Sequence, residues 1–356
     1  MTTTPLTLLC LPGDGIGPEI MAATKAVLGT AAEAEGVALT FEMAEIGFGA
    51  LEQHGTTLPQ TVVERALAVD GVVLGPVSHN AYPPREEGGV NPSGRLRGAL
   101  DLFANIRPAQ RYDGVPTPTE RPIDLVVVRE NLEGFYADRN LYQGPGEFMP
   151  VPGVALAMRR ITAEASERIA RAGYEIAAAR PAKRVAAVHK ANVMRVSDGL
   201  FLDTVRQVAR DFPEVETEEV LVDAAAALLV REPSRFDVII TTNMFGDILS
   251  DLASELAGGL GLAGSLNRGP DHALAQAQHG SAPDIAGRDL ANPVSLITSG
   301  AMLLDHLGAR APAQAIRTAL RSALARPETR TRDLDGSLGT RAFTDSLCTL
   351  IAETAT

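Results

Sequence analysis

The sequence is poor in the features that most often mark a secreted, membrane-bound or nucleic-acid-binding protein. Its 356 residues include only two cysteines, and 32 Lys and Arg stand against 44 Asp and Glu, which gives a net charge of −12. Such a surface repels polyanions, and no basic stretch is interleaved with aromatic residues, so we expect no nucleic-acid partner. No apolar run approaches the ~20 residues of a membrane span, so we expect no membrane partner either.

The cysteines and the first residues together predict a cytoplasmic protein. Cys10 and Cys348 lie in apolar surroundings, which is typical of buried thiols in a reducing compartment. Residues 2–5 lead directly into a strand-like run, without the basic and then apolar pattern of a secretory signal. We therefore expect a cytoplasmic location.

Several common catalytic patterns are also missing. The loop that carries His279 holds no second His or Cys at metal-ligand spacing, which argues against zinc. No Gly-x-Ser-x-Gly or Cys/His pattern of a nucleophilic enzyme stands out. The glycines of residues 13–17 alternate and Pro18 follows them, so this turn is not the G-x-G-x-x-G of a dinucleotide fold. A tight strand-to-helix turn is the simpler interpretation.

The sequence does contain an alternation of short apolar runs with longer helical patterns. The apolar runs are residues 6–11, 71–75, 123–128, 184–188 and 236–241. The helical patterns are residues 19–34, 163–179, 198–211, 243–256, 294–307, 312–325 and 340–352. This alternation predicts a mostly parallel sheet with flanking helices, and the length favours two lobes, since single cores stop growing near ~250–300 residues. Prolines and glycines predict irregular loops at residues 78–92 and 143–153.

The predicted helix 243–256 carries two carboxylates on one face. Asp247 and Asp251 are four residues apart, a spacing that places both side chains on the same side of a helix. Asp223 begins another apolar segment and could complete a set of the oxygen ligands that Mg²⁺ prefers. An isolated Asp-x-x-x-Asp is usually a solvated helix face, so the metal interpretation depends on the residues that accompany it.

Three arginines, a lysine and a tyrosine are the main companions. Arg97, Arg107 and Arg129 could together grip a di- or tricarboxylate through their planar forks, although any one of them is more simply a surface ion-pair partner. Lys190 follows a predicted strand, and near a metal and arginines its pKa would fall until it could act as a base. The simpler alternatives are an ordinary loop lysine and, for Tyr136, a packed ring with its hydroxyl in water.

The most specific segments are LPGDGIGPE (11–19), DLFANIRP (101–108), VREN (128–131), KAN (190–192), NMFGDILSD (243–251) and HGSAPDIAG (279–287). Taken together, they resemble the β-decarboxylating dehydrogenases, the family of isocitrate, homoisocitrate, 3-isopropylmalate and tartrate dehydrogenases. The resemblance implies an α/β, two-domain isocitrate/isopropylmalate dehydrogenase-like fold, with a mostly parallel sheet, flanking helices and a second domain at the dimer interface. Residues 1–102 and 258–356 would form a discontinuous large cofactor-binding domain, and residues 103–257 a small domain for substrate, metal and dimerisation.

The resemblance also implies an activity: oxidative decarboxylation of a 3-substituted (R)-malate to a 2-oxo acid, CO₂ and NADH, with a divalent metal. Tyr136 and Lys190 would be the acid–base pair. The active site would be shared in a homodimer, with Lys190, Asn192 and Asp223 reaching across from the partner chain. The metal, Mg²⁺ or Mn²⁺, would be held by Asp223, Asp247 and Asp251. The hydroxy-acid substrate would be bound by Arg97, Arg107, Arg129, Asn192, Ser93 and Asn91, and NAD by His279, Gly280, Ser281, Ala282, Asp284, Ile285 and Asn292.

Two segments depart from parts of the family and bear on specificity. Asp284 and Ile285 stand where NADP-using relatives carry a Lys-Tyr pair, and an acid there would repel a 2′-phosphate, which predicts NAD. Residues 91–94 (NPSG) replace the leucines that isopropylmalate enzymes place before the first arginine, so we expect a polar C3 substituent, as in isocitrate, homoisocitrate or tartrate. A 3-isopropylmalate dehydrogenase is the alternative, and a non-catalytic regulatory subunit is a more remote one. A non-enzymatic nucleotide-binding module would explain the glycine turn but not the arginines and aspartates.

Overall fold

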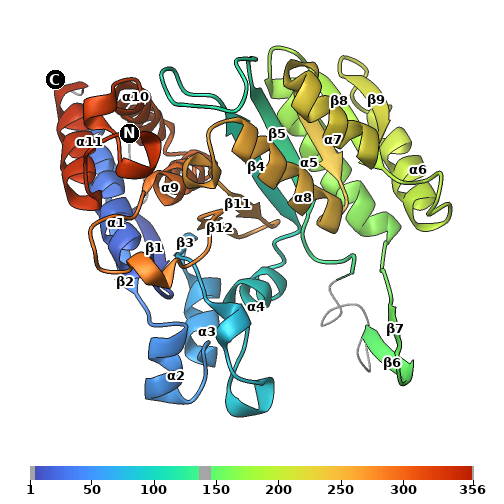
Figure 1. The fold of residues 1–356 in the computed structure, drawn as a ribbon, viewed down its shortest axis with the longest axis horizontal. Coiled ribbons are helices and arrows are strands. Elements are labelled where there is room, and N and C mark those ends of the chain that lie inside the picture. Colours follow the sequence, from blue (N-terminus) through green and yellow to red (C-terminus); the bar gives the residue numbers. More distant parts are fainter. Residues whose placement is uncertain (1–4, 136–145, 355–356) are drawn as a thin grey trace. The chain divides into compact units, whose positions relative to one another are not determined.

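A computed structural model describes residues 5–135 and 146–354, which form two compact units (Figure 1). Unit 1 comprises Met1–Asp101, Arg111–Pro118 and Gly258–Thr356, and unit 2 comprises Leu102–Gln110 and Thr119–Ala257. None of the helices in the described part of the chain combines the length and apolar character that crossing a bilayer would require.

The described residues of unit 1 form five strands that lie in the order β2-β1-β3-β12-β11. The central strand β1 pairs in parallel with β2 and β3, and β12 pairs in parallel with β3 and antiparallel with β11. Leu8, Leu9, Cys10 and Leu11 are all fully buried, as expected for a strand covered on both faces, which therefore reads as a continuous apolar run. The strands are β1 (Leu6–Leu11), β2 (Leu39–Met43), β3 (Gly71–Leu74), β11 (Leu266–Arg268) and β12 (Ala273–Gln276).

Seven α-helices accompany these strands in the described part of unit 1. Long helices α1 (Gly17–Ala34), α9 (Val294–His306), α10 (Arg310–Leu324) and α11 (Thr340–Thr354) contribute to a single apolar core with β1, β3 and β12. Shorter helices carry the loops between the first strands: α2 (Phe48–His54), α3 (Gln60–Ala68) and α4 (Pro92–Ala99).

In the described part of unit 2, five strands form the main sheet, in the order β4-β5-β10-β8-β9. Strand β4 is antiparallel to β5, and the other neighbours are parallel. Successive residues of β5 face opposite sides, so Val126 and Val128 join one core while Leu125 and Val127 join another. The strands are β4 (Ala104–Gln110), β5 (Asp124–Glu130), β8 (Arg184–His189), β9 (Glu216–Leu221) and β10 (Val238–Thr241).

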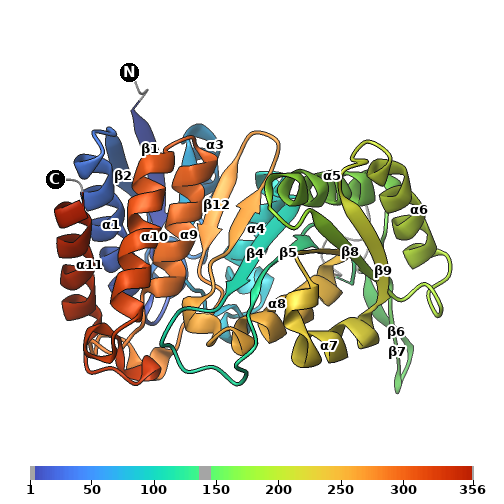
Figure 2. The ribbon, with the colours of Figure 1, turned by 90° about the horizontal axis from the view of Figure 1, so that it is seen from above.

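Helices cover both faces of the unit 2 sheet (Figure 2). Helices α5 (Ala163–Ala179) and α6 (Ser197–Ala209) pack on one core, and α7 (Val222–Arg231) and α8 (Asn243–Leu256) on the other. The carboxyl ends of parallel β5, β8 and β10 therefore meet at one edge, where loops and helix starts carry polar residues.

The prediction of an irregular loop at residues 143–153 is wrong for its described part. Strands β6 (Glu147–Val151) and β7 (Val154–Ala157) form an antiparallel hairpin that is separate from the main sheet (Figure 1). Gly153, with φ of 85°, helps make its turn, and Pro150 falls within the irregular register between Phe148 and Val151. Proline is tolerated at such irregularities, so neither residue breaks the hairpin.

Residues 78–92 are largely irregular, as predicted, but single 3₁₀ turns occur at His79–Ala81 and Arg85–Glu87. The start of this loop is held by the buried Asp14, whose carboxylate accepts hydrogen bonds from the amides of Ser78 (2.8 Å) and Phe48 (2.9 Å) and from the Tyr82 hydroxyl. The aspartate of the glycine-rich turn thus organises two neighbouring loops of unit 1.

Candidate active site

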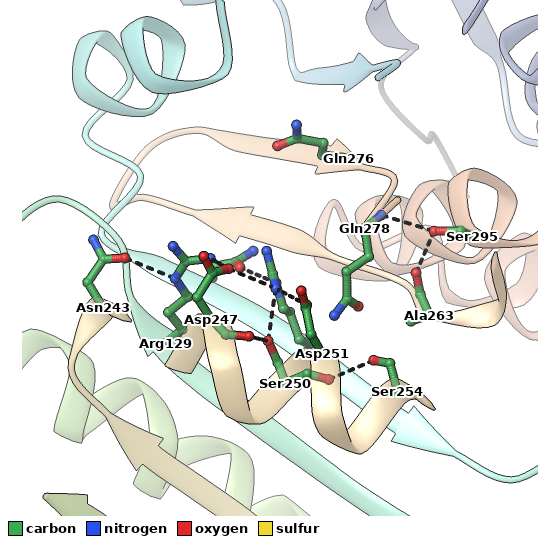
Figure 3. A network of polar contacts seen from close by, with 12 residues as sticks. Arg129, Asn243, Asp247, Ser250, Asp251, Ser254, Ala263, Gln276, Gln278 and Ser295 are labelled. Atoms are coloured by element: carbon green, nitrogen blue, oxygen red, sulfur yellow. Dashed lines mark hydrogen bonds and ion pairs between the residues drawn. The ribbon is translucent and has the colours of Figure 1, made fainter. Parts of the chain in front are cut away.

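Two arginines and two aspartates of unit 2 form one charged cluster, called the arginine–aspartate cluster below (Figure 3). Arg107 comes from β4 and Arg129 from β5, while Asp247 and Asp251 come from successive turns of α8. Arg107 Nη1 lies 3.2 Å from Asp247 Oδ1 and 3.0 Å from Asp251 Oδ1. Arg129 forms an ion pair with Asp247. The structure thus brings together two of the three predicted arginines and two of the three predicted metal ligands.

The start of α8 is fitted closely to Arg129. A Cβ on Gly246 would lie 2.6 Å from Arg129 Cβ, so only glycine allows the helix to approach this strand. Arg129 Nε donates to Asn243 Oδ1 at 2.9 Å, and Asn243 Nδ2 donates to the carbonyl of Glu133 at 2.8 Å. These contacts fix the first turn of α8 against the end of β5.

Burial differs sharply between the two kinds of residue in the cluster. The side chains of Arg129 and Arg107 are 2% and 9% exposed, whereas those of Asp247 and Asp251 are 40% and 48% exposed. A buried guanidinium that loses its partner costs about 3–5 kcal/mol, so the arginines hold the acids in place. The acids in turn present oxygen atoms to solvent.

The donor set of the cluster fits a divalent cation. Two carboxylate oxygens converge within 3.2 Å of one cationic nitrogen of Arg107, so they already meet at a point of positive charge. Magnesium and manganese favour such oxygen ligands and are often held by only one or two carboxylates plus substrate and water.

Lys190 and Asp223 form a second charged pair in unit 2. Lys190 follows the last residue of β8, Asp223 lies in the first turn of α7, and Lys190 Nζ donates to Asp223 Oδ1. This hydrogen bond lowers the pKa of the Asp223 carboxyl below its ordinary value. Asn192, in the same turn as Lys190, is exposed.

Asp223 is not gathered with the α8 acids inside one chain. Across residues 5–135 and 146–354, no three His, Cys, Asp or Glu side chains come together as a metal site. A three-aspartate site therefore requires a third ligand from elsewhere, and its supply by a partner chain stays a prediction.

The remaining predicted substrate residues lie in unit 1, around α4. Ser93 Oγ and Arg97 Nη2 both donate to Gln276 Oε1 at 3.1 Å. Asn91 is the N-cap of α4, and its Oδ1 accepts from the Gly94 amide at 3.2 Å. Its side chain thus has a structural role, which the Asn-Pro sequence at a helix start could have signalled.

The predicted cofactor loop, residues 279–292, packs against the glycine-rich turn of unit 1. The Ile16 amide donates to the Ser281 carbonyl at 2.9 Å, and a Cβ on Gly15 would lie 2.0 Å from that oxygen. His279 Nε2 is buried without a hydrogen-bond partner among the described residues, which fits a polar group of a bound molecule. The other predicted residues include exposed Gly280 and Asp284, partly buried Ala282 and Ile285, and buried Asn292.

Not every predicted cofactor residue has free groups. Asn292 Nδ2 donates to Asp333 Oδ2 at 2.8 Å and its Oδ1 accepts from the Val294 amide at 3.0 Å, so both ends of this side chain serve the fold. Asp284 lies on the 3₁₀ turn Pro283–Ile285 with its side chain toward solvent, where it is open to a ligand. Tyr136, the predicted acid, lies outside the described residues.

Comparisons with known proteins identify the family. The family model described as isocitrate/isopropylmalate dehydrogenase matches residues 7–348. The isocitrate/homoisocitrate dehydrogenase of Thermus thermophilus is 45% identical over 342 residues, which cover 95% of this chain and 97% of that protein. The 3-isopropylmalate dehydrogenase of Archaeoglobus fulgidus is 41% identical over 346 residues, with coverages of 97% and 99%.

A mitochondrial relative and a solved structure agree. Catalytic subunit 5 of the isocitrate dehydrogenase (NAD) of Arabidopsis thaliana is 40% identical over 348 residues, covering 98% of this chain and 89% of that protein. The crystal structure of isocitrate dehydrogenase from Methylococcus capsulatus superposes with a TM-score of 0.88 at 38% identity, covering 98% and 99% of the two chains, which confirms the expected fold class. The chain therefore belongs to the isocitrate/isopropylmalate dehydrogenase family and is a dehydrogenase.

Proposed function

We propose that this dehydrogenase oxidatively decarboxylates a 3-substituted (R)-malate that carries a polar group at C3, with NAD and Mg²⁺ or Mn²⁺. The carrying observation is the arginine–aspartate cluster, in which two solvent-facing carboxylates converge beside two buried guanidinium groups. Carboxylates of this kind suit a divalent ion, and the guanidinium groups beside them suit the carboxylates of a malate.

Each group of the cluster has a distinct part in this reaction. Arg107 and Arg129 bind substrate carboxylates, and Asp247 and Asp251 hold the divalent ion with Asp223 of a second chain. The ion, when bound, lowers the pKa of a nearby hydroxyl and stabilises negative charge that develops on oxygen. Lys190 takes the C2 hydroxyl proton as hydride passes from C2 to the oxidised nicotinamide of NAD, and the resulting β-keto acid loses CO₂. Tyr136 then donates a proton to C3.

The choice of NAD is supported by the loop of residues 279–292. Asp284 is exposed on its 3₁₀ turn, where a carboxylate can accept hydrogen bonds from ribose hydroxyls and would repel a 2′-phosphate. The orphaned Nε2 of His279 supplies a second polar contact in the same loop. One relative carries NAD in its name, which agrees with this assignment.

The preference for a polar C3 substituent is supported by the surroundings of α4. Asn91, the N-cap of α4, and Ser93, in its first turn, are polar and precede Arg97, where a leucine-lined pocket would be needed for an isopropyl group. A relative named isocitrate/homoisocitrate dehydrogenase agrees with this reading, and the 3-isopropylmalate dehydrogenase keeps the apolar alternative open.

A homodimer with shared sites is supported by apolar side chains beside the charged residues. On α8, Met244 and Ile248 are 38% and 58% exposed and lie next to Asp247 and Asp251 in the helix. Further exposed apolar side chains lie on the turn after Lys190 and on the β6–β7 hairpin: Val193, Val196, Phe148, Met149, Val151, Val154 and Leu156. A second copy of the chain would cover this surface and supply the missing third aspartate.

The test is a comparison of kcat/KM for a panel of 3-substituted malates with NAD and Mn²⁺. We expect isocitrate, homoisocitrate or tartrate to exceed 3-isopropylmalate, and NADP to be a poor substitute for NAD. A reversed order would support the isopropylmalate alternative. Flat absorbance at 340 nm with every substrate would contradict the proposal and favour the regulatory subunit.

A further inference from the structure

Asp198 is a fully buried carboxylate that the reaction above does not use. It lies at the start of α6, is 0% exposed, and its Oδ2 accepts from the backbone amide of Lys190 at 2.5 Å. Its Oδ1 forms an ion pair with Arg159, whose own side chain is 8% exposed. One carboxylate thus holds both the turn that carries Lys190 and a buried arginine.

Arg159 connects this carboxylate to the helix that carries the predicted metal ligands. Its Nη1 also donates to Ser197 Oγ at 3.1 Å, and its Nη2 donates to Thr242 Oγ1 at 2.8 Å. The guanidinium carbon lies 5.4 Å from the ring centre of Phe245, in the first turn of α8.

Thr242 shows that this connection displaces an ordinary stabilising contact. It is the N-cap residue of α8, yet its hydroxyl makes no capping hydrogen bond to the helix amides. A threonine at this position usually accepts from the second or third amide of the helix. Here the hydroxyl oxygen accepts from Arg159 instead, so the helix start is tied to the Asp198 carboxylate.

We propose that Asp198 and Arg159 are positioning residues that hold the Lys190 turn in register with the first turn of α8. The role of Lys190 as the base rests on the proposed function. Both charged side chains are buried and mutually satisfied, and they join the carboxyl ends of β8 and β10, where the turn and the helix begin. A loss of either charge would leave the other buried and unpaired, so the turn would shift.

The opposite end of the same strands offers a matched control. Asp237 is 3% exposed as a side chain, forms an ion pair with Arg180 and accepts from the Arg184 amide at 3.2 Å. It therefore copies the pattern of Asp198, one arginine and one backbone amide, at the amino ends of β8 and β10. Its loss should reduce stability by a similar amount without reaching Lys190.

The experiment compares Asp198→Asn, Arg159→Met and Arg159→Lys with Asp237→Asn, using the full chain with NAD, Mn²⁺ and the most active substrate of the panel. For Asp198→Asn we expect kcat to fall by about 10- to 100-fold, because small displacements of reacting groups are costly. The pH dependence of kcat should shift, while KM for NAD stays near its wild-type value. Arg159→Lys should recover part of the activity lost in Arg159→Met, and Asp237→Asn should keep wild-type kcat.

A second readout does not depend on catalysis. The rate at which acetic anhydride modifies Lys190, measured by mass spectrometry across pH, should change several-fold in Asp198→Asn and not in Asp237→Asn. This readout still tests the positioning role if none of the panel's substrates supports NAD reduction by the wild type. That outcome would overturn the proposed function but not the positioning role. If Asp198→Asn does not fold, Thr242→Val is the milder variant, with a smaller change of the same sign. Wild-type labelling and a wild-type pH profile in a folded variant, with only its stability reduced, would overturn the proposal.

Discussion

The two charged sets of unit 2 are built in opposite ways. In the arginine–aspartate cluster, Arg129 and Arg107 are almost wholly buried and hold two acids whose oxygens face solvent. In the other set, Lys190 and Asp223 are 25% and 65% exposed as side chains and have each other as partner. One is fixed by the interior of its unit and the other lies at its surface.

This difference indicates how the work of the site is divided. Buried arginines fix the acids before any ligand arrives, so little reorganisation of the two carboxylates is needed to bind a cation. An exposed Lys–Asp pair contributes little stability and can exchange partners at small cost. This contrast agrees with the proposed sharing of sites between two chains, in which the Lys190–Asp223 pair would serve the site of the other chain.

The largest effect should come from Asp247→Asn, which removes a negative charge from the arginine–aspartate cluster. The amide can still accept from Arg129, so we expect a folded protein with a thermal midpoint near that of the wild type. The lost negative charge should reduce kcat by at least about 1,000-fold, because a preorganised electrostatic group is removed from the reacting centre. Glu255→Gln, which alters another acid of α8, is the control. Near-normal turnover of Asp247→Asn without added metal would show that the cluster is not the reactive site.

Lys190→Met disrupts the Lys190–Asp223 pair. It should lower kcat by about 100-fold or more, as expected for the loss of a general base. The sharper form of this test mixes the Lys190→Met and Asp247→Asn chains under conditions that allow subunit exchange. If sites are shared, a mixed dimer of two-fold symmetry contains one intact site, so about a quarter of wild-type activity should return. If the mixture is no more active than either single variant, Lys190 and Asp247 act in the site of the same chain. The two charged sets would then not be divided between chains.

The acids of the arginine–aspartate cluster are easier to predict from the sequence than the Lys190–Asp223 pair, for a physical reason. Asp247 and Asp251 belong to one helix, and helical spacing alone determines that they share a face. The pairing of Arg107 with both acids depends on the antiparallel register of β4 on β5, which no local pattern specifies. Here the resemblance to a family supplied what spacing did not.

Other parts of the molecule gave no local signal. The sequence does not reveal the hairpin β6–β7, because Pro150 and Gly153 mark loops in most contexts and its exposed side chains provide no apolar alternation against a core. The pairing of Asp198 with Arg159 also has no local signal, because the two residues are 39 positions apart and meet only in the folded unit. Asp14 is a visible part of the glycine-rich turn in the sequence. The pattern of the turn does not predict its three hydrogen bonds, because their donors lie in other loops.

Ile248→Glu tests whether a second chain covers the face beside the acids. Burial of an isoleucine contributes about 2 kcal/mol, and a charge at a buried contact adds a further cost, so we expect the dimer to dissociate at lower dilution than the wild type. Specific activity should then fall as the protein is diluted, as measured by sedimentation velocity and initial rates at matched concentrations. Leu67→Glu, at another exposed apolar position on α3 of unit 1, should change neither the dimer nor the specific activity. A dimer of unaltered stability in Ile248→Glu would move the interface away from α8.

The smallest effect concerns Glu130, which follows Arg129 in β5 on the buried side of the arginine–aspartate cluster. Burial raises the pKa of its carboxyl from about 4.5 to about 7, opposed by hydrogen bonds from the amides of Leu132 and Glu133. The folded protein therefore keeps a proton between these two values that the unfolded chain releases. Its contribution to stability is present below about pH 4.5 and is lost as pH rises through 7, by about 3 kcal/mol at most.

Glu130→Gln removes this titration and keeps an oxygen that can accept from one of the amides. We expect its urea midpoint to exceed that of the wild type increasingly from pH 5 to pH 8, since only the wild type must bury a charge at the higher pH. Glu255→Gln should run parallel to the wild type over that range. If the urea midpoint of Glu130→Gln also stays parallel to that of the wild type, the Glu130 carboxylate is ionised over the whole range. The interior beside Arg129 would then hold a negative charge without cost, despite its burial.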